Sequence, residues 1–303
     1  MISLKALSLI PAMVTPFNAE GALDVDALRS LAVYLIQQQH NDALLVNGTT
    51  GESPTTSTDE KLSIIRHVKE ALNQAGCVRP IIAGAGTNNT ATTAQLAQAS
   101  VQAGADALLI VVPYYNKPSQ AGMLAHFGVV AQAVPNTPII IYNIPGRTGV
   151  LMLPETMASL HAQYPNIVGV KQSHGDMEAV GTIGRLLPPS FIVWSGDDPL
   201  TLPMMTNGAT GVISVLSHVA GPTIAQMMAA YQQGDVAKAQ GLHQQLLPIG
   251  QQLFTLPNPT IIKSLLAHQG VIPSAVFRLP LVPIQPDEER LLTNVVAALQ
   301  TIR

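Results

Sequence analysis

Residues 167–171 read Ile-Val-Gly-Val-Lys, a short apolar run that ends on an amine. A run of this length, rich in β-branched side chains, is typical of a strand buried on both faces of a parallel sheet. Only 11% of the 303 residues are charged, and burying an ammonium is costly unless it has a partner or a task. Partial withdrawal from water lowers the pKa of a lysine, and its neutral amine can then attack a carbonyl carbon to form a Schiff base. The run therefore predicts a strand that carries a nucleophile, Lys171.

Seven more apolar runs follow the same pattern, and longer segments of helical period separate them. With 167–171, the predicted strands are 9–14, 43–46, 81–85, 107–112, 139–142, 191–195 and 211–215. The predicted helices lie near 24–39, 58–75, 90–103, 119–133, 153–164, 176–186 and 200–206. Eight apolar strands without a hairpin signal favour an α/β fold, a closed (β/α)8 or TIM barrel. An open, doubly wound sheet is the alternative.

The chain continues well beyond the eighth predicted strand. Amphipathic segments follow near 222–233, 235–253, 259–269 and 287–301. One helix is enough to complete the last β/α unit, so the others predict a small C-terminal helical extension. No linker, repeat or low-complexity stretch divides the sequence. We expect a catalytic barrel over residues 1–222 and a barrel-closing and C-terminal helical extension over residues 223–303.

The composition argues against several classes of partner. A net charge of −3 and the lack of a basic cluster leave no surface suited to nucleic acid or an anionic membrane. Cys77 is the only cysteine, and the opening residues lack a signal-peptide cleavage pattern, so a reducing cytoplasm is expected. Residues 199–234 carry no charged side chain, yet prolines and glycines interrupt them before they could span a bilayer.

The residues just after the strands of such a barrel form its active site. The second strand leads into residues 47–53, Asn-Gly-Thr-Thr-Gly-Glu-Ser, where glycines free the backbone and hydroxyls and amides can hold a carboxylate. An ordinary helix-capping turn is the alternative reading. The third strand leads into residues 84–88, which lack the third glycine and the acidic residue of a dinucleotide site. We therefore expect no cofactor.

Polar side chains also follow the later strands. Three of the six tyrosines, Tyr114, Tyr115 and Tyr142, stand at the ends of the fourth and fifth strands. A phenol beside a reacting carbonyl can relay protons, although single tyrosines more often pack a rim or an interface. Arg147 is suited to bind a carboxylate through two nitrogens, with a structural salt bridge as the alternative. Residues 195–198, Ser-Gly-Asp-Asp, predict a turn and helix cap and no metal site, because no His or Cys stands at ligand spacing.

Six motifs taken together resemble one known family. They lie at residues 48–53, 113–116, 142–149, 169–171, 195–198 and 211–215. They are similar to the dihydrodipicolinate synthases, of the dihydrodipicolinate synthase and N-acetylneuraminate lyase family. The similarity extends to residues 257–259 and 278–280, so it covers nearly the whole chain. It implies a (β/α)8 barrel lyase that condenses pyruvate with L-aspartate-4-semialdehyde to 4-hydroxy-tetrahydrodipicolinate, in lysine (diaminopimelate) biosynthesis, without a metal ion.

The resemblance implies a catalytic role for four residues. Lys171 would form the imine with pyruvate. Thr49, Tyr142 and Tyr115 would form a proton relay, and Tyr115 would come from the neighbouring subunit of a homotetramer built as a dimer of dimers.

Four further residues would bind the substrates. Thr50 would bind the pyruvate carboxylate through its hydroxyl and its amide. Arg147 would hold the carboxylate of L-aspartate-4-semialdehyde. The backbone at Gly196 and Ile213 would line the pocket.

Lysine-sensitive members of the family carry an effector site for lysine at a dimer interface, with a His and a Glu. Lys61 and Thr92 stand at the matching positions here, so an acidic partner is lost and a cation is gained. Ser53, Asn88 and Tyr114 remain as polar contacts. The resemblance therefore implies a degenerate allosteric site and an enzyme that lysine does not inhibit.

One departure bears on the second substrate. Gln172, Ser173 and His174 follow Lys171, where the synthases usually have Glu, Ala and then Thr or Ser. A Gln at this position is familiar from the N-acetylneuraminate lyases, whereas Arg147 favours the synthase. The runner-up is a class I retro-aldol lyase on a 2-keto-3-deoxy sugar acid or N-acetylneuraminate, releasing pyruvate. A third reading is a non-catalytic barrel that senses a keto acid, and the complete imine and relay set argues against it.

Overall fold

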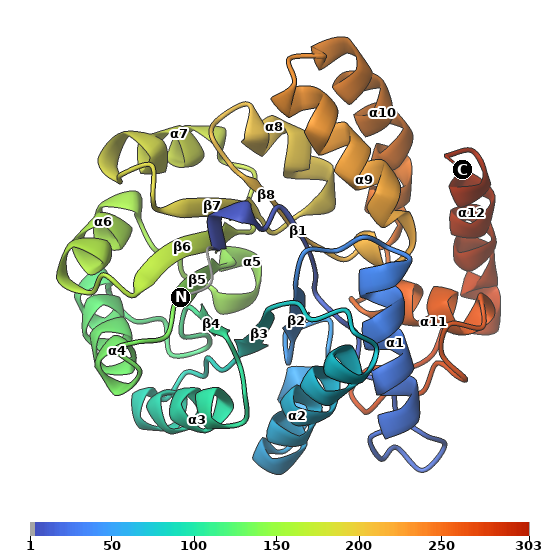
Figure 1. Ribbon diagram of the computed structural model, residues 1–303, viewed down its shortest axis with the longest axis horizontal. Coiled ribbons are helices and arrows are strands. Elements are labelled where there is room, and N and C mark those ends of the chain that lie inside the picture. The colour runs from blue at the N-terminus through green and yellow to red at the C-terminus, as the bar shows by residue number, and fades with distance from the viewer. Residues whose placement is uncertain (1–3, 303) are drawn as a thin grey trace. The chain divides into compact units, whose positions relative to one another are not determined.

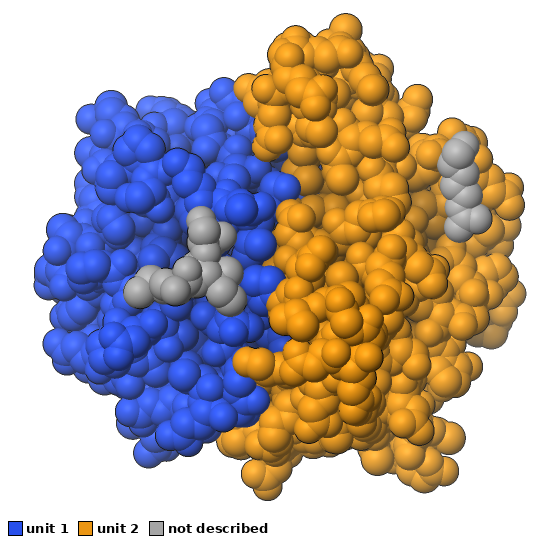
Figure 2. Space-filling model, in the orientation of Figure 1, with its two compact units in different colours: residues 1–8, 80–213 blue, residues 9–79, 214–303 orange. Residues whose placement is uncertain are grey.

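The computed structural model describes residues 4–302, which form two compact units (Figure 2). One unit comprises the chain up to Ser8 together with Pro80–Ile213. The other comprises Leu9–Arg79 and the chain from Ser214 onward. The expected boundary at residue 222 stays a prediction.

The first unit contains six consecutive parallel strands, apart from Ser214, the last residue of β8. They are β3 (Ile81–Gly84), β4 (Ala107–Val111), β5 (Ile139–Asn143), β6 (Ile167–Gln172), β7 (Ile192–Ser195) and β8 (Gly211–Ser214). Nearly every residue of these strands is buried. This explains why they appear in the sequence as continuous apolar runs without alternation.

Helices separate these strands in the sequence. They are α3 (Thr90–Gln102), α4 (Gln120–Ala133), α5 (Pro145–Thr148), α6 (Pro154–Gln163), α7 (Met177–Leu186) and α8 (Thr201–Met205), with short 3-10 turns η1 (Leu4–Ala6) and η3 (Asp198–Leu200). Figure 1 shows α3, α4, α6 and α7 outside the strands of this unit. The loop that connects each strand to the next helix begins at the carboxyl end of the strand, and the candidate site residues lie in or near these loops.

The second unit combines the first two strands with the C-terminal helices. Its elements are β1 (Leu9–Pro11), α1 (Val25–Gln37), β2 (Leu44–Val46), η2 (Ser53–Thr55), α2 (Thr58–Gln74), α9 (Ser217–Gln232), α10 (Val236–Gln252), α11 (Thr260–His268), η4 (Pro286–Glu288) and α12 (Glu289–Gln300). Helix α10 packs on α9, and α12 packs on α10 and α11. Helix α9 in turn packs on β1, so the C-terminal helices are connected to the strands of this unit through α9.

All eight strands belong to one parallel sheet and alternate with helices, which confirms the predicted (β/α)8 barrel. Several predicted helices begin one residue early, because their first residue is the N-cap. Asp24, Asp176 and Asp235 each accept a hydrogen bond from the backbone N–H three residues on. Helix α5 was not predicted, since four residues framed by Pro145 and Gly149 carry no helical period.

The uncharged stretch 199–234 forms α8, β8 and α9. Helix α9 is interrupted by non-helical backbone at Ala220 and contains Pro222, as the sequence predicted. No helix within residues 4–302 is both long and apolar enough to cross a membrane.

Gly169 allows β6 and β7 to approach each other closely. A Cβ at residue 169 would lie 2.4 Å from the carbonyl oxygen of Ile192 and 3.0 Å from the Trp194 ring. Any side chain there would separate the two strands. The glycine in the Ile-Val-Gly-Val-Lys run therefore preserves the pairing of Lys171 with Trp194.

His218, in α9, is fully buried with both ring nitrogens bonded. Its Nε2 accepts from the Val14 backbone N–H at 3.2 Å, and its Nδ1 lies 2.8 Å from the Val215 carbonyl oxygen, to which it donates. Burial lowers the pKa of His218 to about 4, although the Val215 bond opposes the shift. Protonation would add an N–H at Nε2, facing the Val14 donor, so the folded chain keeps the ring neutral.

His218 should make the protein less stable in mild acid. Its folded pKa of about 4 lies below the ordinary value of 6.5, so between these values the unfolded chain binds more protons. Stability should therefore fall as the pH drops from 6.5 to 4, by about 3 kcal/mol from this residue. Urea unfolding at pH 7 and pH 4.5 should show a smaller decrease for His218→Gln, which does not titrate. Equal decreases in both proteins would contradict this assignment.

Candidate active site

Lys171 lies near the carboxyl end of β6 and is 6% exposed. The strand register pairs it with Tyr142 on β5 and Trp194 on β7. Its Nζ lies 4.4 Å from the centroid of the Tyr142 ring, within the range of a cation–π contact. The predicted nucleophile and the predicted relay phenol are thus neighbours on adjacent strands.

Gly196, just after β7, lies against the side chains of Lys171 in β6 and Ser173 just beyond it. A Cβ at residue 196 would lie 1.8 Å from Ser173 Oγ and 3.0 Å from Lys171 Cε. Ser173 Oγ is buried and has no hydrogen-bond partner among the described residues. A buried hydroxyl without a partner is uncommon in a finished core. Ser173 therefore offers a free polar group close to the lysine, which sequence reasoning did not assign.

Asp197 adds a second unpartnered group to this region. Its Oδ1 is buried without a partner in the described part of the chain. Burial raises the pKa of the Asp197 carboxyl and Asp198 adds to the rise, while a hydrogen bond from the Leu200 backbone and the charge of Lys171 oppose it. The backbone N–H of Asp197 donates to Ser195 Oγ at 3.2 Å, so a predicted turn is present.

A chain of buried amides explains Gln172 and His174. Asn143 Nδ2 donates to the Met152 carbonyl at 3.0 Å and to Gln172 Oε1 at 3.1 Å. Gln172 Nε2 then faces His174 Nε2 at 2.5 Å, and the Asp176 backbone N–H faces His174 Nδ1 at 3.3 Å. A neutral ring can accept from one of these two donors, whereas an imidazolium could accept from neither, so the arrangement disfavours the charged ring. Burial also lowers the pKa of His174, with the nearby Asp176 opposing.

The loop after β2, in the second unit, contains Thr49, which is half-buried, and Thr50, which is 2% exposed. Thr50 Oγ1 accepts a hydrogen bond from Asn258 Nδ2 at 2.9 Å. Thr15 Oγ1 donates to the Gly51 carbonyl at 2.7 Å. Glu52 has φ 54°, a left-handed conformation that is unfavourable for a residue with a side chain. Contacts from distant parts of this unit therefore hold the loop.

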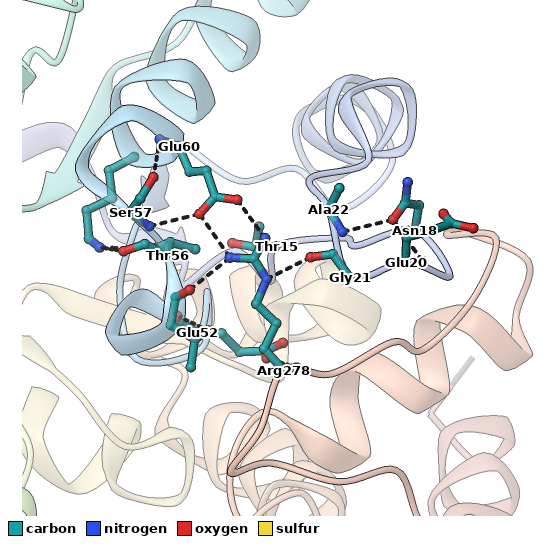
Figure 3. A network of polar contacts seen from close by, with 12 residues as sticks. Thr15, Asn18, Glu20, Gly21, Ala22, Glu52, Thr56, Ser57, Glu60 and Arg278 are labelled. Atoms are coloured by element: carbon teal, nitrogen blue, oxygen red, sulfur yellow. Dashed lines mark hydrogen bonds and ion pairs between the residues drawn. The ribbon is translucent and has the colours of Figure 1, made fainter.

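Two ion pairs close this loop against the C-terminal extension. Lys263 Nζ lies 2.6 Å from Glu52 Oε1, and both side chains are fully buried. Arg278 Nη2 lies 2.6 Å from Glu60 Oε1, and the Arg278 backbone N–H donates to Glu52 Oε2 at 3.1 Å (Figure 3). The bond from Arg278 lowers the pKa of Glu60 to about 2. The sequence analysis did not predict the Lys263–Glu52 pair, because its two residues are 211 positions apart in the sequence.

Tyr115 and Arg147 are exposed, whereas Lys171 is buried. Tyr115 is 89% exposed with φ 71°, and Tyr114 is 39% exposed. Arg147 is exposed on α5, and residues 4–302 supply no ionic partner for it. Ile213 is buried in β8. An exposed aromatic ring on strained backbone is unusual for a surface without a partner.

The residues of the predicted degenerate lysine site are divided between the two units. In the second unit, Lys61 Nζ donates to the Ser53 carbonyl at 2.8 Å, to Thr56 Oγ1 at 2.9 Å and to the Thr56 carbonyl. Burial lowers the pKa of Lys61. In the first unit, the Asn88 carbonyl accepts from Asn116 Nδ2, and Thr92 is exposed on α3.

Comparison with known proteins gives a consistent result. A family model described as the dihydrodipicolinate synthetase family matches residues 5–299. The chain belongs to the dihydrodipicolinate synthetase family. The resemblance drawn from the six motifs is thereby confirmed.

Individual relatives match over nearly their whole length. The 4-hydroxy-tetrahydrodipicolinate synthase of Bacillus subtilis is 45% identical over 288 residues, 95% of this chain and 97% of the relative. A dihydrodipicolinate synthase structure from Bacillus anthracis is 40% identical with a TM-score of 0.92 and covers 100% of both chains. A structure of the enzyme from Cyanidioschyzon merolae with lysine bound is 40% identical with a TM-score of 0.94, covering 98% of this chain and 99% of that one.

No group of three or more His, Cys, Asp or Glu side chains within residues 4–302 is arranged to hold a metal ion. The reactive groups that this family member presents near Lys171 are a phenol, a hydroxyl and a carboxyl. Such groups suit proton transfer around a covalent lysine adduct.

Gly196→Ala should reduce the reactivity of Lys171 more than it reduces the stability of the fold. The added Cβ would meet Ser173 Oγ and Lys171 Cε, so the lysine amine must shift, and reductive trapping by an α-keto acid should fall about tenfold or more. Gly181→Ala in α7 is the control, because nothing lies within 4 Å of its Cβ position. Trapping is measured from the mass of the peptide containing Lys171. Unchanged trapping in Gly196→Ala would show that this close approach is unimportant.

Proposed function

We propose that this chain is a 4-hydroxy-tetrahydrodipicolinate synthase, which condenses pyruvate with L-aspartate-4-semialdehyde. The observation that carries the proposal is the buried amine of Lys171 beside Tyr142, in a chain 45% identical to a synthase of that name. The amine adds to the pyruvate C2 carbonyl and water leaves, giving an imine. The imine withdraws electrons, so the C3 methyl group loses a proton to give an enamine. The enamine carbon then attacks the aldehyde of the second substrate.

Proton transfers accompany each of these steps. Tyr142, adjacent to Lys171 in the strand register, is the relay member that meets the adduct, with Thr49 next and Tyr115 toward solvent. The 89% exposure of Tyr115 supports its insertion into a neighbouring subunit's site, in a homotetramer formed as a dimer of dimers. We infer a cytoplasmic enzyme from its substrates and its lone cysteine.

Two residues bind the substrate carboxylates. Thr50 binds the pyruvate carboxylate through its hydroxyl and its amide, supported by the fixed conformation of its loop. Arg147, exposed and without an ionic partner in residues 4–302, binds the carboxylate of L-aspartate-4-semialdehyde. The backbone of Gly196 and Ile213 lines the pocket.

Borohydride with pyruvate should label this protein irreversibly at Lys171, because reduction converts an imine into a stable secondary amine. Peptide mass spectrometry should place the added mass on Lys171 alone. Lys171→Ala should lose the label and keep the fold. Lys263→Met is not a suitable control, because it leaves Glu52 without its partner. An exposed lysine such as Lys238 serves instead, and Lys238→Ala should be labelled like the unchanged protein. Absence of label at Lys171 would refute the covalent mechanism.

Arg147→Ala should impair condensation far more than imine formation, since the guanidinium orients the second substrate. Losing such a pair costs about 2–5 kcal/mol, so kcat/KM for L-aspartate-4-semialdehyde should fall by a factor of about 30 or more. Trapping by pyruvate should stay unchanged. Equal losses in both assays would show that Arg147 is structural.

L-Lysine should not inhibit the enzyme. The relative from Cyanidioschyzon merolae has lysine bound, but here the Lys61 ammonium is held by Ser53 and Thr56 and Thr92 supplies no carboxylate. A second cation nearby disfavours a cationic effector. Titration with millimolar L-lysine at saturating substrates should leave the rate unchanged, and clear partial inhibition would contradict the prediction.

A further inference from the structure

Among the described residues, the Asn258 side chain makes one hydrogen bond, and its partner is Thr50, a proposed substrate-binding residue. Its Nδ2 donates to Thr50 Oγ1 at 2.9 Å, with both residues buried at 8% and 2% exposure. Asn258 stands 208 residues from Thr50 in the sequence, just before α11 of the C-terminal extension. Both residues lie in the second unit.

The direction of this hydrogen bond restricts the Thr50 hydroxyl. A hydroxyl has one proton to donate and two lone pairs that accept. The Asn258 N–H occupies a lone pair of Oγ1, so the Thr50 O–H must turn away from Asn258. No described residue accepts that proton within the unit. The hydroxyl is therefore left as a donor for an acceptor from outside the protein.

We propose that Asn258 is a positioning residue, which directs the Thr50 O–H toward the carboxylate of pyruvate. The inference rests on the proposed function, in which Thr50 binds that carboxylate. A carboxylate only accepts hydrogen bonds, so it needs the donor orientation that Asn258 imposes. Orienting the hydroxyl before substrate arrives removes an entropic cost from binding.

The neighbouring ion pair holds the backbone for the same purpose. Lys263, one turn into α11, pairs with Glu52 at 2.6 Å, and Asn258 bonds Thr50 just ahead of that helix. The C-terminal extension therefore contacts the loop at two positions, Thr50 and Glu52, which are two residues apart in the sequence. The ion pair with Lys263 helps to offset the conformational cost of the left-handed Glu52 backbone, whereas Asn258 acts on the proton of the Thr50 hydroxyl.

The substitution Asn258→Asp distinguishes a role in orienting the Thr50 hydroxyl from a role in packing alone. Aspartate has nearly the same shape, but its carboxylate accepts only. It would take the Thr50 proton and reverse the hydrogen bond. Asn258→Ala instead leaves the hydroxyl free to rotate toward the substrate. A purely structural bond predicts that alanine is the more harmful change, and the proposal predicts that aspartate is.

The test measures KM for each substrate, kcat and thermal stability in the full-length enzyme. Asn258→Asp should raise the pyruvate KM about tenfold or more, as for loss of a hydrogen bond to a charged group, and more than Asn258→Ala does. The KM for L-aspartate-4-semialdehyde should stay within about twofold, less than the loss of one hydrogen bond. Asn41→Asp is the matched control, since Asn41 is a buried asparagine of the same unit that donates to Leu35. Its pyruvate KM should not change.

A double-mutant cycle between Thr50 and Asn258 tests the proposal independently. Thr50→Val removes the hydroxyl, so adding Asn258→Ala to it should cause no further rise in pyruvate KM. The cycle also decides the matter if Asn258→Asp does not fold. Additive losses, or a larger effect of alanine than of aspartate, would overturn the proposal. If the unchanged enzyme is not trapped by pyruvate and borohydride, the proposed function fails. If it is trapped and the KM order is reversed, only the role of Asn258 fails.

Discussion

The buried pair of Lys263 and Glu52 is the interaction on which the loop after β2, with the proposed substrate-binding residue Thr50, depends. Both side chains are fully buried at a separation of 2.6 Å, and removing either partner from such a pair costs about 3–5 kcal/mol because a charge stays behind unpaired. The pair also fixes Glu52 in a left-handed conformation, which turns the chain from the Thr-Thr segment toward α2. Arg278 joins the same carboxylate to Glu60 through its backbone and side chain (Figure 3). The C-terminal helices are therefore part of the machinery that shapes the loop.

Lys171, the proposed nucleophile, is buried in a different way from Lys263. Lys263 is buried and held by a carboxylate, whereas Lys171 is buried over the Tyr142 ring and has no ion pair among residues 4–302. The carboxylate of Glu52 therefore commits the Lys263 amine to a structural contact, and no ion pair among the described residues commits the Lys171 amine in this way. The strand, the glycine at 169 and the glycine at 196 then determine where that amine lies.

Much of this organisation could be predicted from the sequence. Apolar runs indicated all eight strands, and the helical period predicted the helix starts near Asp24 and Asp235 to within one residue, because both are local signals. Helix α5 was missed since four residues have no period. The Lys263 and Glu52 pair was missed because only the folded chain brings such distant residues together. His174 had no explanation in the sequence, and the bond to Gln172 supplies one. The role of Tyr115 stays a prediction, since it depends on a neighbouring subunit.

The central claim is that an imine at Lys171 serves condensation with L-aspartate-4-semialdehyde. The most direct measurement compares two activities of one purified preparation. One is the consumption of pyruvate that depends on L-aspartate-4-semialdehyde, and the other is the release of pyruvate from N-acetylneuraminate or a 2-keto-3-deoxy sugar acid. We predict rapid consumption in the first assay, lost in Lys171→Ala, and no release above background in the second. Faster release from a sugar acid than consumption with the semialdehyde would contradict the account and identify a lyase.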